Sequence, residues 1–252
     1  MKAILQSLLA CFALATSAAP ALAQKPQLDP ATLLTGEWAL SEYRGLPFAI
    51  YGAKDLNAAK KCPLILALHG KSDNNTNGPQ VGGWMKSFAK PERYAKNPCI
   101  IVAPLCYQPF GGTGGGWGAK PGDQAIDLVK ALVKALPAVD AKRIYVAGHS
   151  MGGFGTCHLI ARAPQMFAAG IPVSGYASGT DVVSGQRTPM WLCHAADDTV
   201  VGVAGARAFA KASSRSKAFH YTEYPTGGHG IPSVVFEDEK LHEWLFAQGR
   251  RP

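Results

Sequence analysis

The chain of 252 residues is predicted to fold as one α/β domain, with a mostly parallel, doubly wound sheet of about eight strands, an antiparallel start and no large lid. Two features of the sequence lead to this prediction. Short apolar runs alternate along the chain with amphipathic stretches, which is typical of strand–helix–strand units. The runs in the middle of the chain are apolar at every position, as expected for parallel strands that helices cover on both faces.

The antiparallel start is expected at residues 37–42 and 46–51, because Arg44-Gly45 between these two runs is a typical hairpin signal. We expect the parallel strands at residues 63–68, 99–103, 143–147, 170–173, 190–194 and 219–224. We expect the helices that connect them at residues 123–136, 151–162, 201–212 and 234–246. No low-complexity linker interrupts this order, which indicates one domain over residues 37–252, preceded by a polar leader at residues 24–36.

Residues 1–23 have the three parts of a secretory signal peptide. Lys2 supplies the positive charge, a stretch without acidic residues supplies the apolar region, and Ala21-Leu22-Ala23 is a small-x-small cleavage site. A membrane anchor is disfavoured because polar residues and a proline break the apolar run. Lipid attachment at Cys11 is a minor alternative that would leave an unusually short apolar region. We expect cleavage after Ala23 and a secreted or periplasmic protein.

The composition is that of a globular protein. Hydrophobic residues make up 47% of the chain and charged residues 17%, a balance that supports a sizeable core and argues against disorder. The formal net charge is +8, but the basic residues are scattered and form no long run, so a basic soluble surface explains them better than nucleic-acid binding. We therefore expect no nucleic-acid partner and no stable membrane anchor. The oligomeric state does not follow from the sequence.

The sequence predicts neither a metal nor a cofactor. All cysteines except Cys11 lie beyond the leader, without a Cys-x-x-Cys pair, and the histidines lack a spacing suited to a metal. The glycine run at residues 111–116 lacks the Lys-Ser/Thr of a phosphate-binding P-loop and leads to Trp117-Gly118 and Pro121 before any helix. A surface loop is expected there instead.

The strongest chemical signal is Gly148-His149-Ser150-Met151-Gly152, a Gly-x-Ser-x-Gly motif directly between an expected strand and an expected helix. Small residues in that context permit a tight turn that lifts the serine hydroxyl above the sheet, at the positive end of the helix. A structural serine in a turn is the alternative. The context favours a nucleophile at Ser150.

A serine hydroxyl becomes a strong nucleophile only when a positioned base takes its proton. His229 fits this role, because it lies between glycines in a loop after the last expected strand. The base in turn needs a carboxylate that holds its tautomer, and Asp197 and Asp198 both follow the strand at 190–194. Reasoning from the residues alone does not choose between these two aspartates.

The oxyanion of a tetrahedral intermediate needs two preset hydrogen-bond donors. The backbone N–H of Met151, next to the nucleophile, is one of them. His69-Gly70 ends an earlier central strand, which makes the backbone N–H of Lys71 the natural second donor. A plain turn at the end of the strand is the alternative.

With these motifs assembled, the chain resembles the α/β-hydrolase superfamily over about residues 37–250. Within it, the chain is similar to exported bacterial carboxylesterases related to the phospholipase/carboxylesterase, dienelactone-hydrolase and polyhydroxybutyrate-depolymerase-like groups. The segments that carry the resemblance are residues 63–70, 102–106, 140–156 and 221–229. Dienelactone hydrolases proper have a cysteine nucleophile where this chain has Ser150, which disfavours that group.

The resemblance also implies which aspartate is the acid. Related enzymes carry His-Gly-x-x-Asp-x-x-Val-Pro at this point, and matching His194 and Val201 to that pattern places the acid at Asp198. Two positions depart from the pattern, with Ala195 in place of its glycine and Gly202 in place of its proline.

The resemblance implies a secreted serine carboxylesterase that cleaves carboxylic esters, small or polymer-linked, through an acyl-enzyme on Ser150. A serine peptidase of the same fold is the alternative within enzymes. A catalytically idle, exported polysaccharide-binding protein is a further alternative, which the intact motifs disfavour. Without a long insertion to form a lid, the acyl pocket is expected to be shallow and open.

A further expectation concerns a pair of cysteines. In the strand order of the superfamily, the strands that begin near Cys62 and Cys99 are neighbours, which makes a disulfide between these cysteines possible.

The candidates for substrate contact are His69, Tyr107, Trp117 and His149. Trp117 lies in the loop after the strand at 99–103, at the carboxyl edge where such folds bind ligands. Its indole could stack on an aromatic acyl group or a sugar ring. Packing of the loop against the domain is an equally weighted alternative for this residue.

Overall fold

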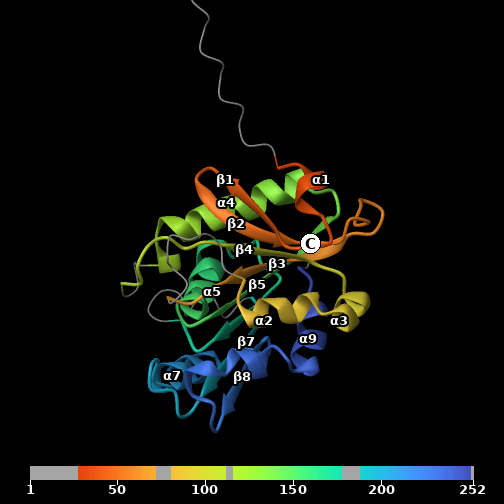
Figure 1. Ribbon diagram of the computed structural model, residues 1–252. Coiled ribbons are helices and arrows are strands. Elements are labelled where there is room, and N and C mark those ends of the chain that lie inside the picture. Colours follow the sequence, from red (N-terminus) through yellow and green to blue (C-terminus); the bar gives the residue numbers. More distant parts are fainter. Residues whose placement is uncertain (1–27, 72–80, 112–115, 178–187, 251–252) are drawn as a thin grey trace, which may run out of the picture.

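The computed structural model describes residues 28–71, 81–111, 116–177 and 188–250, and these form an open sheet between two layers of helices (Figure 1). The strands are β1 (Ala39–Tyr43), β2 (Leu46–Tyr51), β3 (Cys62–Leu68), β4 (Ile100–Pro104), β5 (Val139–His149), β6 (Ala169–Val173), β7 (Met190–Ala195) and β8 (Phe219–Tyr224). Their order is β1-β2-β4-β3-β5-β6-β7-β8 in an 8-stranded sheet. The pairs β1–β2 and β2–β4 are antiparallel and all others are parallel. The predicted fold class is confirmed.

The helices that cover the two faces come from different parts of the chain. One face carries α1 (Pro30–Leu33), α4 (Lys120–Ala135), α5 (Met151–Arg162) and α7 (Ala204–Ser213), and the other carries α2 (Gly83–Lys86), α3 (Pro91–Lys96), α8 (Pro232–Val235) and α9 (Glu239–Phe246) (Figure 1). Among the described residues, no helix is long and apolar enough to cross a bilayer.

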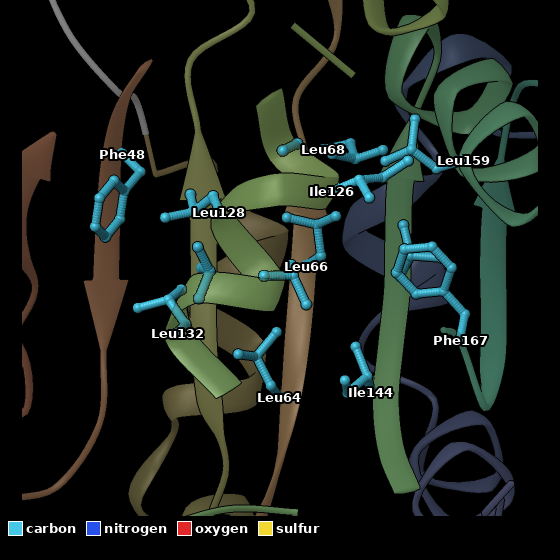
Figure 2. Packing of buried hydrophobic residues seen from close by; sticks show 14 of the residues in the cluster. Phe48, Leu64, Leu66, Leu68, Ile126, Leu128, Leu132, Ile144, Leu159 and Phe167 are labelled. Atoms are coloured by element: carbon cyan, nitrogen blue, oxygen red, sulfur yellow. The ribbon is translucent and has the colours of Figure 1, made fainter. Parts of the chain in front are cut away.

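The central strands have side chains buried on both faces, which is why they are apolar at every position. Along β3, Leu64 and Leu66 belong to the cluster under α4 and α5, whereas Ile65 and Ala67 belong to the cluster on the opposite face. All four side chains are fully buried. Figure 2 shows the first cluster, where β3, α4 and α5 interdigitate. This burial of apolar area supplies the main favourable term of folding.

The expected hairpin forms at the start of the sheet. Arg44 and Gly45 both have positive φ, 50° and 77°, and they join β1 to β2 with Tyr43 opposite Leu46. Two consecutive left-handed residues are what a two-residue hairpin turn of the primed type requires.

Two of the expected segments have a different structure. The helix expected at residues 234–246 is two helices, α8 and α9, because the Asp238 carboxylate accepts a hydrogen bond from the Lys240 N–H and starts a new helix there. The polar leader contains α1, whose Leu33 is buried in the core. The expected signal peptide at residues 1–23 and most of the glycine run lie outside the described residues.

The expected disulfide between Cys62 and Cys99 is wrong. Both residues are buried free thiols, and although β3 and β4 are neighbours, Cys62 packs in the cluster under α4 and Cys99 packs in the cluster on the other face. The pairing of Leu64 with Ile100 explains this, because it offsets the two cysteines by one residue and side chains alternate between faces. Strand order alone could not give this register.

We therefore expect all five described cysteines to react with a thiol reagent after denaturation without reductant. In the native protein their reaction should be slow, because burial raises the pKa of Cys62 and Cys106 to about 11 and raises that of Cys99 and Cys193 as well. Absorbance-monitored thiol titration measures the number of reactive thiols after denaturation and their rate of reaction in the native protein. A count of only three reactive thiols after denaturation would show that a disulfide forms after all.

Candidate active site

The sharp turn between β5 and α5 holds Ser150 above the carboxyl edge of the sheet. Ser150 has φ 56° and ψ −117°, a strained conformation for a residue with a side chain. The flanking glycines make this turn possible: a Cβ on Gly148 would lie 2.2 Å from the Gly152 carbonyl oxygen, and one on Gly152 would lie 2.0 Å from that of Leu68. At the N-cap of α5 the Ser150 side chain makes no capping hydrogen bond, so its hydroxyl is directed elsewhere.

The Ser150 hydroxyl is hydrogen-bonded to His229, and His229 is hydrogen-bonded to Asp198. Ser150 Oγ lies 2.8 Å from His229 Nε2, and His229 Nδ1 lies 2.8 Å from Asp198 Oδ2. We call these three side chains the Ser150–His229–Asp198 array. They come from loops after β5, β8 and β7, so only the folded sheet brings them together. The arrangement lets His229 take a proton from Ser150 while Asp198 holds the imidazole.

The structure distinguishes the two adjacent aspartates. Asp198 is 6% exposed and contacts the imidazole, whereas Asp197 points to the loop that carries His229 and accepts hydrogen bonds from Gly228 N at 2.8 Å and Gly227 N at 3.2 Å. Both glycines have positive φ, which lets the loop turn tightly before His229. Asp197 thus fixes the loop and Asp198 orients the ring.

The acid is held ionised by its surroundings. Burial by itself would raise the pKa of Asp198, but the hydrogen bonds from His229 and from the backbone N–H groups of Val201 and Val200 outweigh it, and the pKa lies below its ordinary value. A carboxylate with this shift stabilises the fold above the unfolded-state pKa, about 3.9, and the stabilisation is lost as pH falls through the lower folded-state pKa.

We expect Asp198→Asn to lower the free energy of unfolding most near neutral pH, with the difference from the wild type shrinking below about pH 4. Urea unfolding at a series of pH values measures this difference. A difference that grows on acidification would contradict the pKa direction given above.

The two expected oxyanion donors lie beside the nucleophile. Met151 is buried and follows Ser150 at the start of α5. Gly70, which precedes Lys71, approaches Ser150 so closely that an added Cβ would lie 3.6 Å from the Ser150 Cβ. The backbone around Lys71 therefore adjoins the nucleophile, as an oxyanion donor must.

Two of the expected substrate-contact residues have structural roles. His69 is 1% exposed, its Nδ1 donates to the Gly70 carbonyl at 2.8 Å, and its Nε2 accepts from the Cys106 N–H at 2.8 Å. His149 Nε2 donates to the carbonyl of His229 at 2.9 Å and its ring lies 4.7 Å from the ring of His229. His69 thus connects two strand ends, and His149 helps to hold the base in place.

Trp117, expected either to contact substrate or to pack the loop against the domain, lies in a packed position. Trp117 is 1% exposed, its Nε1 donates to the His69 carbonyl at 3.0 Å, and its ring packs edge-on against the His69 ring and over Gly155 of α5. Tyr107 is 39% exposed, but its hydroxyl donates to Gln124 at 2.6 Å, at the start of α4.

We expect Trp117→Phe to destabilise the protein by about 1 to 3 kcal/mol, since the buried carbonyl of His69 loses its donor. Any loss of activity should be the same for aromatic and acetyl esters, because the ring does not border the substrate. Thermal unfolding and kcat/KM on both ester types measure this. A selective loss on aromatic esters with unchanged stability would reverse the assignment.

An apolar cavity of about 460 Å³ lies at the opposite end of β5 from Ser150. Aliphatic side chains such as Val129, Val133 and Ile144 line it, and no serine, cysteine, histidine or carboxylate is among its described lining residues. An apolar cavity is the usual first candidate for a binding site. Here the hydrogen-bonded serine, histidine and carboxylate lie at the Ser150 edge of the sheet, so we place the candidate site there.

The sequence analysis gave no role in the site to His194. This residue ends β7 and is fully buried beside Asp198, with its Nε2 3.5 Å from Asp198 Oδ2. The His-Gly-x-x-Asp pattern already placed His194 four residues before Asp198. That spacing after a strand end does not by itself predict that the two side chains meet.

The chain is similar to several known proteins. Residues 113–185 match the model of the prolyl oligopeptidase family. A bifunctional acetylxylan esterase/xylanase of Neocallimastix patriciarum is 27% identical over 191 residues, which are 75% of this chain and 26% of that protein. The crystal structure of a thermostable esterase is 29% identical with a TM-score of 0.75, over 85% of this chain and 63% of that one.

The fold also occurs in a peptidase. The acylaminoacyl peptidase of Pyrococcus horikoshii has a TM-score of 0.66 at 16% identity, over 85% of this chain and 42% of that chain. The chain thus spans about a quarter of the curated relative and less than two thirds of either of these structures.

Proposed function

We propose, from the premise that this chain belongs to the α/β-hydrolase superfamily and resembles its esterases, that it is a serine carboxylesterase acting through an acyl-enzyme on Ser150. One observation carries the proposal: the unbroken hydrogen-bonded path from Ser150 Oγ through the imidazole of His229 to the buried carboxylate of Asp198. A serine that serves only a turn has no need of either partner.

In the proposed mechanism, Ser150 Oγ attacks the ester carbonyl carbon while His229 Nε2 takes the hydroxyl proton. The carbonyl oxygen becomes an oxyanion, which the backbone N–H groups of Met151 and Lys71 stabilise. The intermediate collapses, the C–O bond to the alcohol breaks, and His229 returns the proton to the leaving oxygen. Water then attacks the acyl-serine by the same proton path, releasing the acid and restoring Ser150.

The proposed substrates are short acyl esters, with acetyl groups on a carbohydrate as the first to test. The curated relative is named for an acetylxylan esterase activity and a xylanase activity. The array fits acyl transfer, because glycoside hydrolysis normally requires two carboxylates that flank the scissile bond. The array holds one carboxylate, Asp198, whose Oδ2 is engaged by His229.

Peptide hydrolysis is the second candidate, because the matched family model and one structural neighbour are named for peptidases. The deciding experiment is a panel of p-nitrophenyl acetate, p-nitrophenyl butyrate, acetylated xylan, a feruloyl ester and N-acylated peptide anilides, with Ser150→Ala as the blank. We expect turnover of the acyl esters and none of the anilides. Turnover of anilides alone would favour the peptidase, and no labelling by a fluorophosphonate probe would favour an idle binding protein.

We also propose that the chain is exported, with residues 1–23 removed as a signal peptide. The support is the charged, apolar and small-x-small pattern of these residues. Expression of the full chain in a bacterial host, followed by N-terminal sequencing of the protein outside the cytoplasm, should give a first residue of Gln24. A protein that keeps Lys2 in the cytoplasmic fraction would contradict export.

A further inference from the structure

A second histidine lies behind the acid of the array. His194 ends β7, four residues before Asp198, and its side chain is fully buried. Its Nε2 donates to the carbonyl of Val201 at 2.7 Å and lies 3.5 Å from Asp198 Oδ2, the same oxygen that His229 Nδ1 contacts. The carboxylate thus has one histidine on its solvent side and another on its core side.

The contact with Val201 closes the loop that carries the acid. Val201 N donates to Asp198 Oδ1 at 2.9 Å, while the Val201 carbonyl accepts from His194. Residues 195–201 therefore fold back onto the strand they leave, and Asp198 is held between the two. If the His194 donor were removed, the Val201 peptide would lose its anchor, and the carboxylate would lose a fixed position as well as a nearby N–H.

The other groups near His194 are engaged elsewhere. Glu223 lies opposite His194 in the register of β7 and β8, but its carboxylate accepts from Arg207 Nη2 at 2.6 Å and from the Tyr221 hydroxyl at 2.6 Å. The ring of Tyr176 lies 6.4 Å from the His194 ring. His194 Nδ1 is buried and has no hydrogen-bond partner among the described residues, so the proton of the ring belongs on Nε2.

Burial and an unpartnered Nδ1 do not by themselves indicate a role in the site. His242 on α9 has both features, and its Nε2 donates to the Phe236 carbonyl at 2.9 Å, far along the chain from Asp198. What distinguishes His194 is the group that its N–H reaches. Its Nε2 donates to the carbonyl of Val201, the residue whose N–H holds Asp198, and lies 3.5 Å from the carboxylate itself.

We propose that His194 is a positioning residue for the reaction of Ser150, acting through Asp198: its Nε2–H fixes the Val201 peptide and the carboxylate, and so keeps Asp198 Oδ2 on the imidazole of His229. The inference rests on the proposed role of the Ser150–His229–Asp198 array. It does not depend on which acyl group or alcohol the enzyme accepts.

The test measures how fast Ser150 is labelled by a fluorophosphonate, a readout that needs no knowledge of the substrate. His194→Met removes the donor at similar length, and His194→Gln keeps an N–H donor at nearly the same place. We expect His194→Met to slow labelling by about ten- to a hundred-fold, the range expected when a catalytic group loses its orienting partner. The His194→Gln variant should be labelled at a rate within about threefold of the wild type. His242→Met should lower the melting temperature without slowing labelling.

A double-mutant cycle separates positioning from general destabilisation. Because His194 acts through Asp198, we expect His194→Met to slow labelling less than about twofold further in an Asp198→Asn background. Equal slowing in both backgrounds, or equal slowing by the Gln and Met variants, would overturn the proposal in favour of packing. Wild-type protein that is not labelled at all would instead refute the proposed nucleophile, which keeps the two failures distinct.

Discussion

Replacement of Ser150 by alanine is expected to lower kcat for ester hydrolysis by about four to six orders of magnitude, because the members of such an array act as a unit. The variant loses the atom that attacks the carbonyl, while the backbone N–H groups of Met151 and Lys71 remain to bind the oxyanion. The variant should therefore still hydrolyse the ester slightly faster than the uncatalysed reaction in water. Initial rates with p-nitrophenyl acetate at high enzyme concentration measure it.

The fold should survive this substitution. Alanine has the same Cβ as serine and accepts the same backbone angles, and the Ser150 side chain makes no capping hydrogen bond to α5. The melting temperature should stay within a few degrees of the wild type. A variant that keeps a tenth or more of the activity while remaining folded would show that Ser150 is not the nucleophile.

Replacement of Asp198 by asparagine is expected to lower kcat by about ten-thousand-fold, since the amide leaves the geometry intact but favours the wrong tautomer of the base. With an N–H₂ or a neutral oxygen in place of Oδ2, the imidazolium that forms when His229 takes the proton loses its counter-charge. The neighbouring Asp197→Asn is the matched control, with the same chemical change one residue away.

Asp197→Asn should cost far less, about tenfold or less, because Asp197 contacts the N–H groups of Gly227 and Gly228 rather than the imidazole. Its amide oxygen can still accept one of these hydrogen bonds. Steady-state kinetics of the two variants under identical conditions give the ranking. If Asp197→Asn were the more damaging variant, the assignment of the acid would be wrong.

Much of the site could be predicted because its signals are local. The turn around Ser150 depends on residues 148–152 and on the strand and helix that flank them, so a short window of sequence contains the geometry that the structure shows. The hairpin at Arg44-Gly45 and the two-sided burial of β3 are local in the same sense. Position along the chain was also enough to expect His229 near Ser150, since the carboxyl ends of parallel strands meet at one edge.

The fold class, Ser150 and His229 could thus be predicted before the fold was known. The folded chain was needed to show which aspartate faces the imidazole, that Cys62 and Cys99 lie on opposite faces, that Trp117 is buried, and that His194 lies behind the acid. These features have one cause in common. The direction of a side chain after a strand end depends on strand register and on loops closed by partners far along the chain, such as the contact between Asp198 and His229, 31 residues apart.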